Sequence, residues 1–273
     1  MRPDHTPSLK RVEGDACSYW TDLALLESRV VVAFSERGGG VSAPPFASLN
    51  LAGHVGDDPG AVDQNRAVFV GATGLSAWRH RLTMAEQVHG ERIALVDAAT
   101  AGAGAFAAYG PPPISATDSL ITTAPQVPLA LCFADCVPVV LVAPGPVVAV
   151  VHAGWRGALA SLPGKTACRM ATQTACDVAQ VRAYVGAHIR DCHYEVDEVL
   201  LSQFVNGFGT FARAESGGLD LDAVVSASLE RVGVARCNIA RLGTCTAEAT
   251  DRFFSYRAED GVTGRHAALA CIL

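Results

Sequence analysis

Two short apolar segments separated by a proline-rich turn constrain this chain more than any other stretch. The segments, residues 139–143 and 147–151, are rich in β-branched residues and too short for helices, and Pro-Gly-Pro lies between them. We therefore predict two adjacent strands joined by a tight turn. A hairpin brings its outer ends together, so it would place Cys136, before the first strand, next to His152, after the second.

Length and composition favour one large globular domain. The chain has 273 residues, half of them apolar, and no linker or charge run divides it, so a core can form without covalent cross-links. The formal net charge is −6, from 21 basic and 27 acidic residues, and no basic cluster occurs. These features argue against nucleic acid and anionic membranes as partners.

The N-terminus and the cysteines indicate a reducing compartment. Residues 1–15 lack the apolar centre of a signal peptide, and no uncharged apolar run of roughly 18 residues occurs elsewhere. We therefore expect a cytoplasmic protein. Its nine cysteines, an odd number, are then expected to be thiols or metal ligands rather than a disulfide framework.

Strands and helices mix irregularly along the chain. Besides the hairpin, apolar patterns predict strands at residues 29–34, 92–96, 118–122, 127–133, 181–189, 239–242 and 266–272. Helical spacing predicts helices at 58–70, 157–177, 194–208 and 219–232, and Pro163 interrupts the second or delays its start. This mixture predicts an α+β fold, a single-domain layered α/β sandwich with mixed or antiparallel sheets.

A glycine-rich segment follows the first predicted strand. Residues 35–42 contain three consecutive glycines, which let a backbone approach a ligand closely, and Arg37, whose planar guanidinium suits an oxyanion. The segment could bind phosphate or carboxylate. It could equally be a flexible turn with a solvated arginine, and these residues alone leave both open.

One cysteine and two histidines suggest a catalytic metal site. A thiolate and two imidazoles suit Zn²⁺ and leave a fourth position for water. Cys136, His152 and His89, which lies beside a glycine at an element boundary, could form such a set. They are not a local ligand motif, so the spacing alone favours a buried cysteine and two unrelated histidines over a metal site. A metal-free alternative is a cysteine hydrolase with Cys136 as nucleophile and His152 or His89 as base.

Eight short blocks, in order along the chain, carry a resemblance to a known family. The blocks are residues 35–42, 46–51, 54–59, 87–90, 116–118, 134–138, 151–157 and 253–257. In this pattern the chain resembles the YfiH-type family, labelled multicopper polyphenol oxidoreductases or laccases and also described as purine nucleoside phosphorylases. One departure is Arg190-Asp191, which stands where the family pattern has Gly-Pro.

The resemblance implies a single α/β sandwich, with an architecture like that of a cysteine hydrolase, in which His89, Cys136 and His152 hold zinc. On this basis residues 28–273 are the catalytic domain, and residues 1–27 are a peripheral or poorly ordered segment. The implied activity is phosphorolysis of adenosine, inosine and methylthioadenosine, together with deamination of adenosine. Nucleoside and phosphate would be the small-molecule partners.

Phosphorolysis places demands on further residues. It requires a cation for the phosphate and an acid near the departing base. Arg37 and Arg156 are the phosphate candidates, although Arg156 could equally cap the hairpin. Gln87 and Asp135 complete the predicted substrate-binding set. Deamination would need a proton shuttle, for which the available acids are Asp135, Asp118 and Glu86.

Two other functions remain to be weighed. A true multicopper laccase needs His-x-His pairs, and none of the eight histidines has that spacing, which excludes it. Copper-dependent oxidation at the three-residue set stays open as an alternative to zinc chemistry. A partner-binding role without catalysis is favoured only if the predicted site residues lie far apart.

Overall fold

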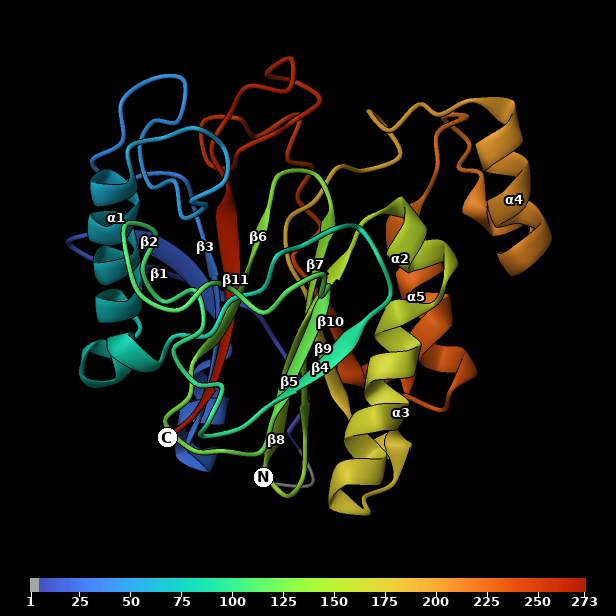
Figure 1. The fold of residues 1–273 in the computed structure, drawn as a ribbon. Coiled ribbons are helices and arrows are strands. Elements are labelled where there is room, and N and C mark those ends of the chain that lie inside the picture. The colour runs from blue at the N-terminus through green and yellow to red at the C-terminus, as the bar shows by residue number, and fades with distance from the viewer. Residues whose placement is uncertain (1–4) are drawn as a thin grey trace.

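The computed structural model describes residues 5–273 and shows two β-sheets packed face to face between helices (Figure 1). The five-stranded sheet has the order β1-β2-β3-β11-β6, with strands β1 (Lys10–Glu13), β2 (Ser18–Thr21), β3 (Val30–Ser35), β6 (Leu129–Phe133) and β11 (His266–Ile272). The six-stranded sheet has the order β10-β9-β7-β8-β5-β4, with strands β4 (Ile93–Val96), β5 (Ser119–Thr122), β7 (Val137–Ala143), β8 (Val147–Ala153), β9 (Arg182–Val185) and β10 (Ile239–Arg241).

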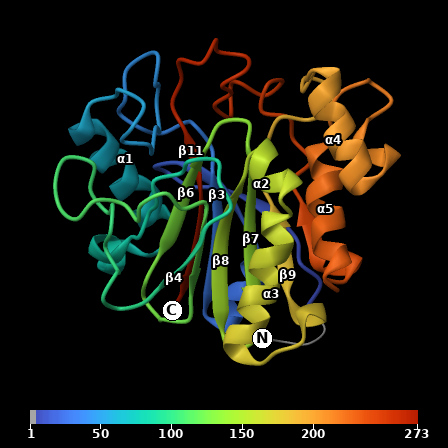
Figure 2. The same cartoon turned by 45° about the vertical axis from the view of Figure 1, so that its right-hand side comes forward.

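Helices cover the outer faces of both sheets (Figures 1 and 2). Helix α1 (Pro59–Ala72) packs on the five-stranded sheet. The opposite side of the molecule carries α2 (Trp155–Leu159), α3 (Leu162–Thr174), α4 (Glu198–Phe208) and α5 (Leu221–Arg231). Short 3-10 helices occupy Leu23–Ser28, Ser76–Arg81, Val178–Gln180, Thr210–Ala212 and Arg236–Asn238. Within residues 5–273, no helix combines the length and apolar character needed to cross a membrane.

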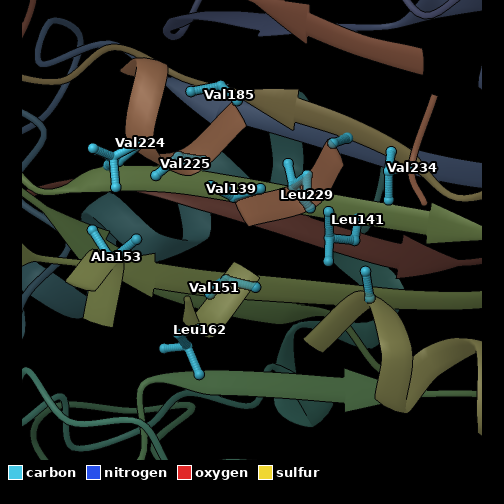
Figure 3. Packing of buried hydrophobic residues seen from close by; sticks show 14 of the residues in the cluster. Val139, Leu141, Val151, Ala153, Leu162, Val185, Val224, Val225, Leu229 and Val234 are labelled. Atoms are coloured by element: carbon cyan, nitrogen blue, oxygen red, sulfur yellow. The ribbon is translucent and has the colours of Figure 1, made fainter. Parts of the chain in front are cut away.

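Alternation along the strands divides the core into layers. Val139 and Val151 face the helices, where they pack with Leu162 and Val224 (Figure 3), whereas Val140 and its neighbours of the same parity fill the space between the sheets. Because both faces of β7 and β8 are covered, every residue of these strands is buried. This explains why they are continuous apolar runs in the sequence.

The structure confirms the predicted α+β layered sandwich and its hairpin. Strands β7 and β8 pair antiparallel, and Pro138 lies opposite His152. The six-stranded sheet is mixed, because the outer pairs β4–β5 and β9–β10 are parallel. The strand predicted at 181–189 is wrong in extent: it ends at Val185, and only a single bridge between His188 and Cys245 continues it.

The structure describes two other predicted segments in more detail. The helix predicted at 157–177 is two helices, α2 and α3, with Pro163 in the first turn of α3, as its fixed φ favours. The family resemblance predicts that residues 1–27 are a peripheral or poorly ordered segment. Of its described part, residues 10–13 and 18–21 form the outer strands of the five-stranded sheet.

Candidate active site

Three side chains from separate segments meet at the open end of the β7–β8 hairpin, between the two sheets. Cys136 directly precedes β7, His152 is the penultimate residue of β8, and His89 lies in the loop before β4. Their potential ligand atoms all lie within 4.8 Å of one another, and Cys136 Sγ is 3.8 Å from His89 Nδ1. The register that sets Pro138 opposite His152 brings the thiol and the imidazole together.

One buried carboxylate orients both histidines. Asp118 Oδ1 is 2.7 Å from His152 Nδ1, and the carboxylate also accepts hydrogen bonds from the backbone N–H groups of Val88, His89 and Gly90. These bonds stabilise His89 in the left-handed region, at φ 57°. Because Nδ1 of His152 faces Asp118, Nε2 is the nitrogen available to a ligand. Asp118, predicted only as a possible proton shuttle, is therefore a positioning residue.

The donor set and its surroundings fit a zinc ion. A thiolate and two imidazoles are preferred zinc ligands, and S and N ligands of a tetrahedral zinc are about 3.6 Å apart, close to the 3.8 Å between Cys136 Sγ and His89 Nδ1. Gly154 is packed against both atoms. A Cβ at this position would lie 2.7 Å from His89 Nδ1 and 3.1 Å from Cys136 Sγ, so only glycine leaves these two atoms undisturbed.

Charge coupling sets the protonation of the pair. Burial alone would raise the pKa of Cys136, but the adjacent imidazoles, His152 above all, outweigh it and lower that pKa to about 6. Burial alone would lower the pKa of His152, whereas the Cys136 thiolate and the Asp118 carboxylate raise it to about 9. Without a metal, the pair is therefore a thiolate and an imidazolium at neutral pH, and the thiolate is the form that attacks carbonyls or binds metals. A metal that binds His152 must displace its second proton.

A cavity of about 430 Å³ opens beside the three side chains, a size typical of small-molecule sites. Besides the three, its lining comprises His54, Gln87, Cys132, Ala134, Asp135, Ile189, Tyr194, Tyr256, Arg257 and Arg265. A smaller cavity of about 140 Å³ borders His89 and Cys136 on the side of Trp155 and Arg156. The three side chains thus lie where a ligand of nucleoside size can reach them.

Gln87 and Asp135, predicted to bind substrate, line the cavity but also hold its walls. The Gln87 amide exchanges two hydrogen bonds of 2.8 Å with the backbone of Cys132. The Asp135 carboxylate accepts hydrogen bonds from the hydroxyls of Thr246 and Ser255 and from the backbone N–H of Arg257. Their polar atoms are therefore largely committed to the protein.

The two predicted phosphate arginines lie in different places. Arg37 is outside the cavity lining. Its guanidinium donates to the carbonyls of Ala47 and Thr250 and to the carboxylate of Glu259, so it fixes loops. Arg156 is exposed, stacks 4.2 Å from the Trp155 ring centroid and borders the smaller cavity. The structure thus brings Arg156 to the site but not Arg37.

Two cavity arginines were missed in the sequence. Arg257 and Arg265 both line the larger cavity. Arg257 belongs to one of the eight family-like blocks, so a signal was present, whereas nothing marked Arg265. Glu86, another predicted shuttle, accepts hydrogen bonds from Ser115 and Ala116 and does not line the cavity.

Arg190-Asp191, the departure from the family pattern, lies in a docked loop. Ser216 Oγ donates to the Asp191 carboxylate over 3.1 Å, and Arg190 Nη1 lies 3.8 Å from Asp222 Oδ2. The loop therefore packs against the segment that leads into α5.

Comparisons with known proteins agree with this architecture. Residues 31–273 match the family model described as multi-copper polyphenol oxidoreductase laccase. Purine nucleoside phosphorylase SCO2081 of Streptomyces coelicolor is 38% identical over 85% of this chain and 91% of its own length. Purine nucleoside phosphorylase YlmD of Bacillus subtilis is 30% identical over 90% of each.

Solved structures show the same fold. The crystal structure of the Bacillus licheniformis hypothetical protein YfiH superposes with a TM-score of 0.87 at 31% identity and covers 95% of this chain and 98% of its own. YlmD from Geobacillus stearothermophilus also gives 0.87 at 31% identity, over 97% of this chain and 99% of its own. The family resemblance and the fold predicted from the sequence are both confirmed.

Proposed function

Because this chain belongs to the multi-copper polyphenol oxidoreductase laccase family, and its curated relatives are named purine nucleoside phosphorylases, we propose that it is a purine nucleoside phosphorylase. The proposed substrates are phosphate with adenosine, inosine or methylthioadenosine, and deamination of adenosine is a second proposed activity. The supporting observation is that His89, Cys136 and His152 converge beside a cavity of about 430 Å³ that two arginines also line.

Zinc is the proposed cofactor, with copper as the alternative metal. The residues that would hold it are His89 through Nδ1, Cys136 through Sγ and His152 through Nε2, and Asp118 keeps the His152 ring in the required orientation. When bound with three protein ligands, zinc supplies Lewis-acid chemistry at its open position. The remaining steps depend on side chains of the cavity itself.

Phosphorolysis joins a phosphate oxygen to the ribose C1′ while the bond from C1′ to the purine nitrogen breaks. The bonding electron pair leaves with the purine, which takes up a proton. Arg257 and Arg265 line the larger cavity and Arg156 the smaller one, and these guanidinium groups would position the phosphate and stabilise the charge that develops in the transition state. The rings of Tyr194 and Tyr256 offer faces for a purine.

The decisive experiment incubates purified protein with inosine or adenosine, with and without phosphate, and separates the products by chromatography. Release of free base together with pentose 1-phosphate only when phosphate is present supports the phosphorylase. Inosine formed from adenosine without phosphate supports the deaminase. Cys136→Ser is the matched inactive variant, and Cys237→Ser, at an exposed cysteine outside the cavity lining, controls for loss of a thiol.

A metal-free cysteine hydrolase is the second candidate, because Cys136, His152 and Asp118 also have the order of nucleophile, base and orienting acid. A chelator separates the two functions, since a cysteine nucleophile keeps its activity when zinc is removed. Reloading the stripped protein with copper and assaying oxidation of a phenol tests the oxidase that the family description names.

A further inference from the structure

A second cluster of thiols and an imidazole lies outside the site described above. Cys192 and His193, in the loop after β9, meet Cys245, which follows β10, and their potential ligand atoms all lie within 4.8 Å of one another. We propose that this cluster is a second zinc site, completed by the carboxylate of Glu248, and that zinc there cross-links the cavity-lining loop of Ile189 and Tyr194 to the segment that follows β10.

The distances from His193 to its three neighbours are close to those around a tetrahedral ion. His193 Nδ1 lies 3.2 Å from Cys192 Sγ, 3.8 Å from Cys245 Sγ and 3.7 Å from Glu248 Oε1. At usual zinc bond lengths, S and N ligands are about 3.6 Å apart, and N and O ligands about 3.4 Å. The three distances from His193 are therefore each within about half an ångström of those expected around one ion. Glu248 is not among the residues whose ligand atoms all lie within 4.8 Å of one another, so its exposed side chain must turn to complete the set.

Backbone contacts hold the two segments together before any metal binds. His188 and Cys245 form a parallel bridge, and the N–H of Thr246 donates to the His188 carbonyl over 3.0 Å. The N–H of Arg190 donates to Cys245 Sγ over 3.3 Å. The sulfur of Cys245 is thus fixed in a buried position, while Cys192 and His193 approach it from the exposed side.

The ligand number indicates the role of the ion. Four protein ligands close the coordination sphere, which is the pattern of structural rather than catalytic zinc. Its neighbours belong to the cavity wall: Tyr194 follows His193 directly, and Arg257 Nη1 donates to the His193 carbonyl over 3.2 Å. Zinc at this cluster would therefore fix the positions of Tyr194 and Arg257.

Zinc stoichiometry tests the proposal on the full chain. The protein is stripped with a chelator, reloaded with Zn²⁺ under reducing conditions, passed through gel filtration and analysed for metal. We expect Cys192→Ser and His193→Gln each to retain one zinc fewer per chain than the unmodified protein, and Cys237→Ser to retain the same number. Because only the difference is used, the result does not depend on whether the His89, Cys136 and His152 site is filled.

Cobalt(II) gives a second measurement. The loss of one of two thiolate ligands at this cluster should reduce the sulfur-to-cobalt charge-transfer absorption of Cys192→Ser but not of Cys237→Ser. Equal zinc content in Cys192→Ser and the unmodified protein would overturn the proposal. So would a disulfide between Cys192 and Cys245, detected by peptide mass spectrometry, that persists in protein supplied with reductant and Zn²⁺.

Discussion

The two thiol–imidazole clusters differ in how firmly the protein holds their side chains. In the His89, Cys136 and His152 cluster, only 4% of the His152 side chain is exposed, and buried Asp118 fixes its ring. In the Cys192, His193 and Cys245 cluster, His193 is exposed, and its neighbouring carboxylate, Glu248, is itself 57% exposed. A buried acid therefore orients a histidine of the first cluster, whereas loops are the main support of the second cluster.

This difference teaches what distinguishes a reaction centre from a structural cross-link. Catalysis needs ligands that keep their geometry while substrate and product exchange at an open position, which requires groups behind the ligands. A cross-link needs only enough ligands to close the coordination sphere. If the two clusters divide these roles, substitutions in one should affect the protein differently from substitutions in the other.

The largest expected contrast is in activity. Cys136→Ser should lower kcat/KM for phosphorolysis by more than roughly 100-fold, because it removes a proposed ligand rather than a supporting group. Cys192→Ser should lower it by less than about tenfold, mainly through KM, since it only loosens the wall carrying Tyr194. Steady-state kinetics on both variants measures the contrast, and equal losses would show that the division of roles is wrong.

Removal of the Asp118 carboxylate should have the second-largest effect. Asp118→Asn keeps the size of the side chain but weakens its bond to His152 Nδ1, and roughly 10–100-fold loss of zinc affinity is expected. Competition with a chromophoric chelator measures this affinity. Glu91→Gln, at an exposed acid paired with Lys165, is the matched control and should bind zinc as the unmodified protein does. Unchanged affinity in Asp118→Asn would mean that the imidazole needs no such support.

The less exposed of the two thiols, Cys136, should be more reactive than Cys192. Cys192 is the more exposed thiol, but burial of its sulfur and the nearby Cys245 and Glu248 raise its pKa to about 12, whereas the pKa of Cys136 is lowered to about 6. In zinc-free protein at pH 7, Cys136 should react with iodoacetamide at least about tenfold faster, because the thiolate is the nucleophile. The rate at Cys136 should fall as pH drops below 6, where its sulfur takes up a proton.

Peptide mass spectrometry of the alkylated protein gives both rates. Faster labelling of Cys192 than of Cys136 at pH 7 would show that access, rather than the imidazolium neighbours, controls these thiols.

The smallest expected effect is that of Gly154→Ala. The added Cβ would press on His89 Nδ1 at 2.7 Å, so the ligands must shift, and we expect zinc affinity to fall about tenfold or less, up to roughly 1.4 kcal/mol. Gly207→Ala is the control, because a Cβ there meets only Leu159 at 3.9 Å. Identical zinc affinities in the two variants would mean that the ligands tolerate crowding.

Local patterns predicted much of the fold. The Pro-Gly-Pro turn and two β-branched runs were enough to predict the hairpin, and from it the proximity of Cys136 and His152, because strand pairing over so short a loop leaves little freedom. The layered architecture followed from the mixture of elements. Such inferences work where the determining contacts are close in sequence.

Distant contacts explain what was missed. Arg37 was a reasonable phosphate candidate beside three glycines, but one of its acceptors is the carbonyl of Thr250, 213 residues further along. The orienting role of Asp118 depends on a fold that brings it to a histidine 34 residues away. The pairing of Cys192 with Cys245 likewise depends on the bridge between His188 and Cys245, which no local pattern encodes.

In the antiparallel pair β7–β8, the direction of the His152 side chain depends on whether an even or an odd number of residues precedes it in the strand. Side chains on a strand point alternately to opposite faces, and His152 shares its face with Val148 and Val150, toward the space between the sheets. Deleting one residue between Val147 and His152 would turn the imidazole toward the helices, whereas deleting two would preserve its direction. An even or odd residue count within this one strand therefore decides whether the imidazole can meet the thiol at all.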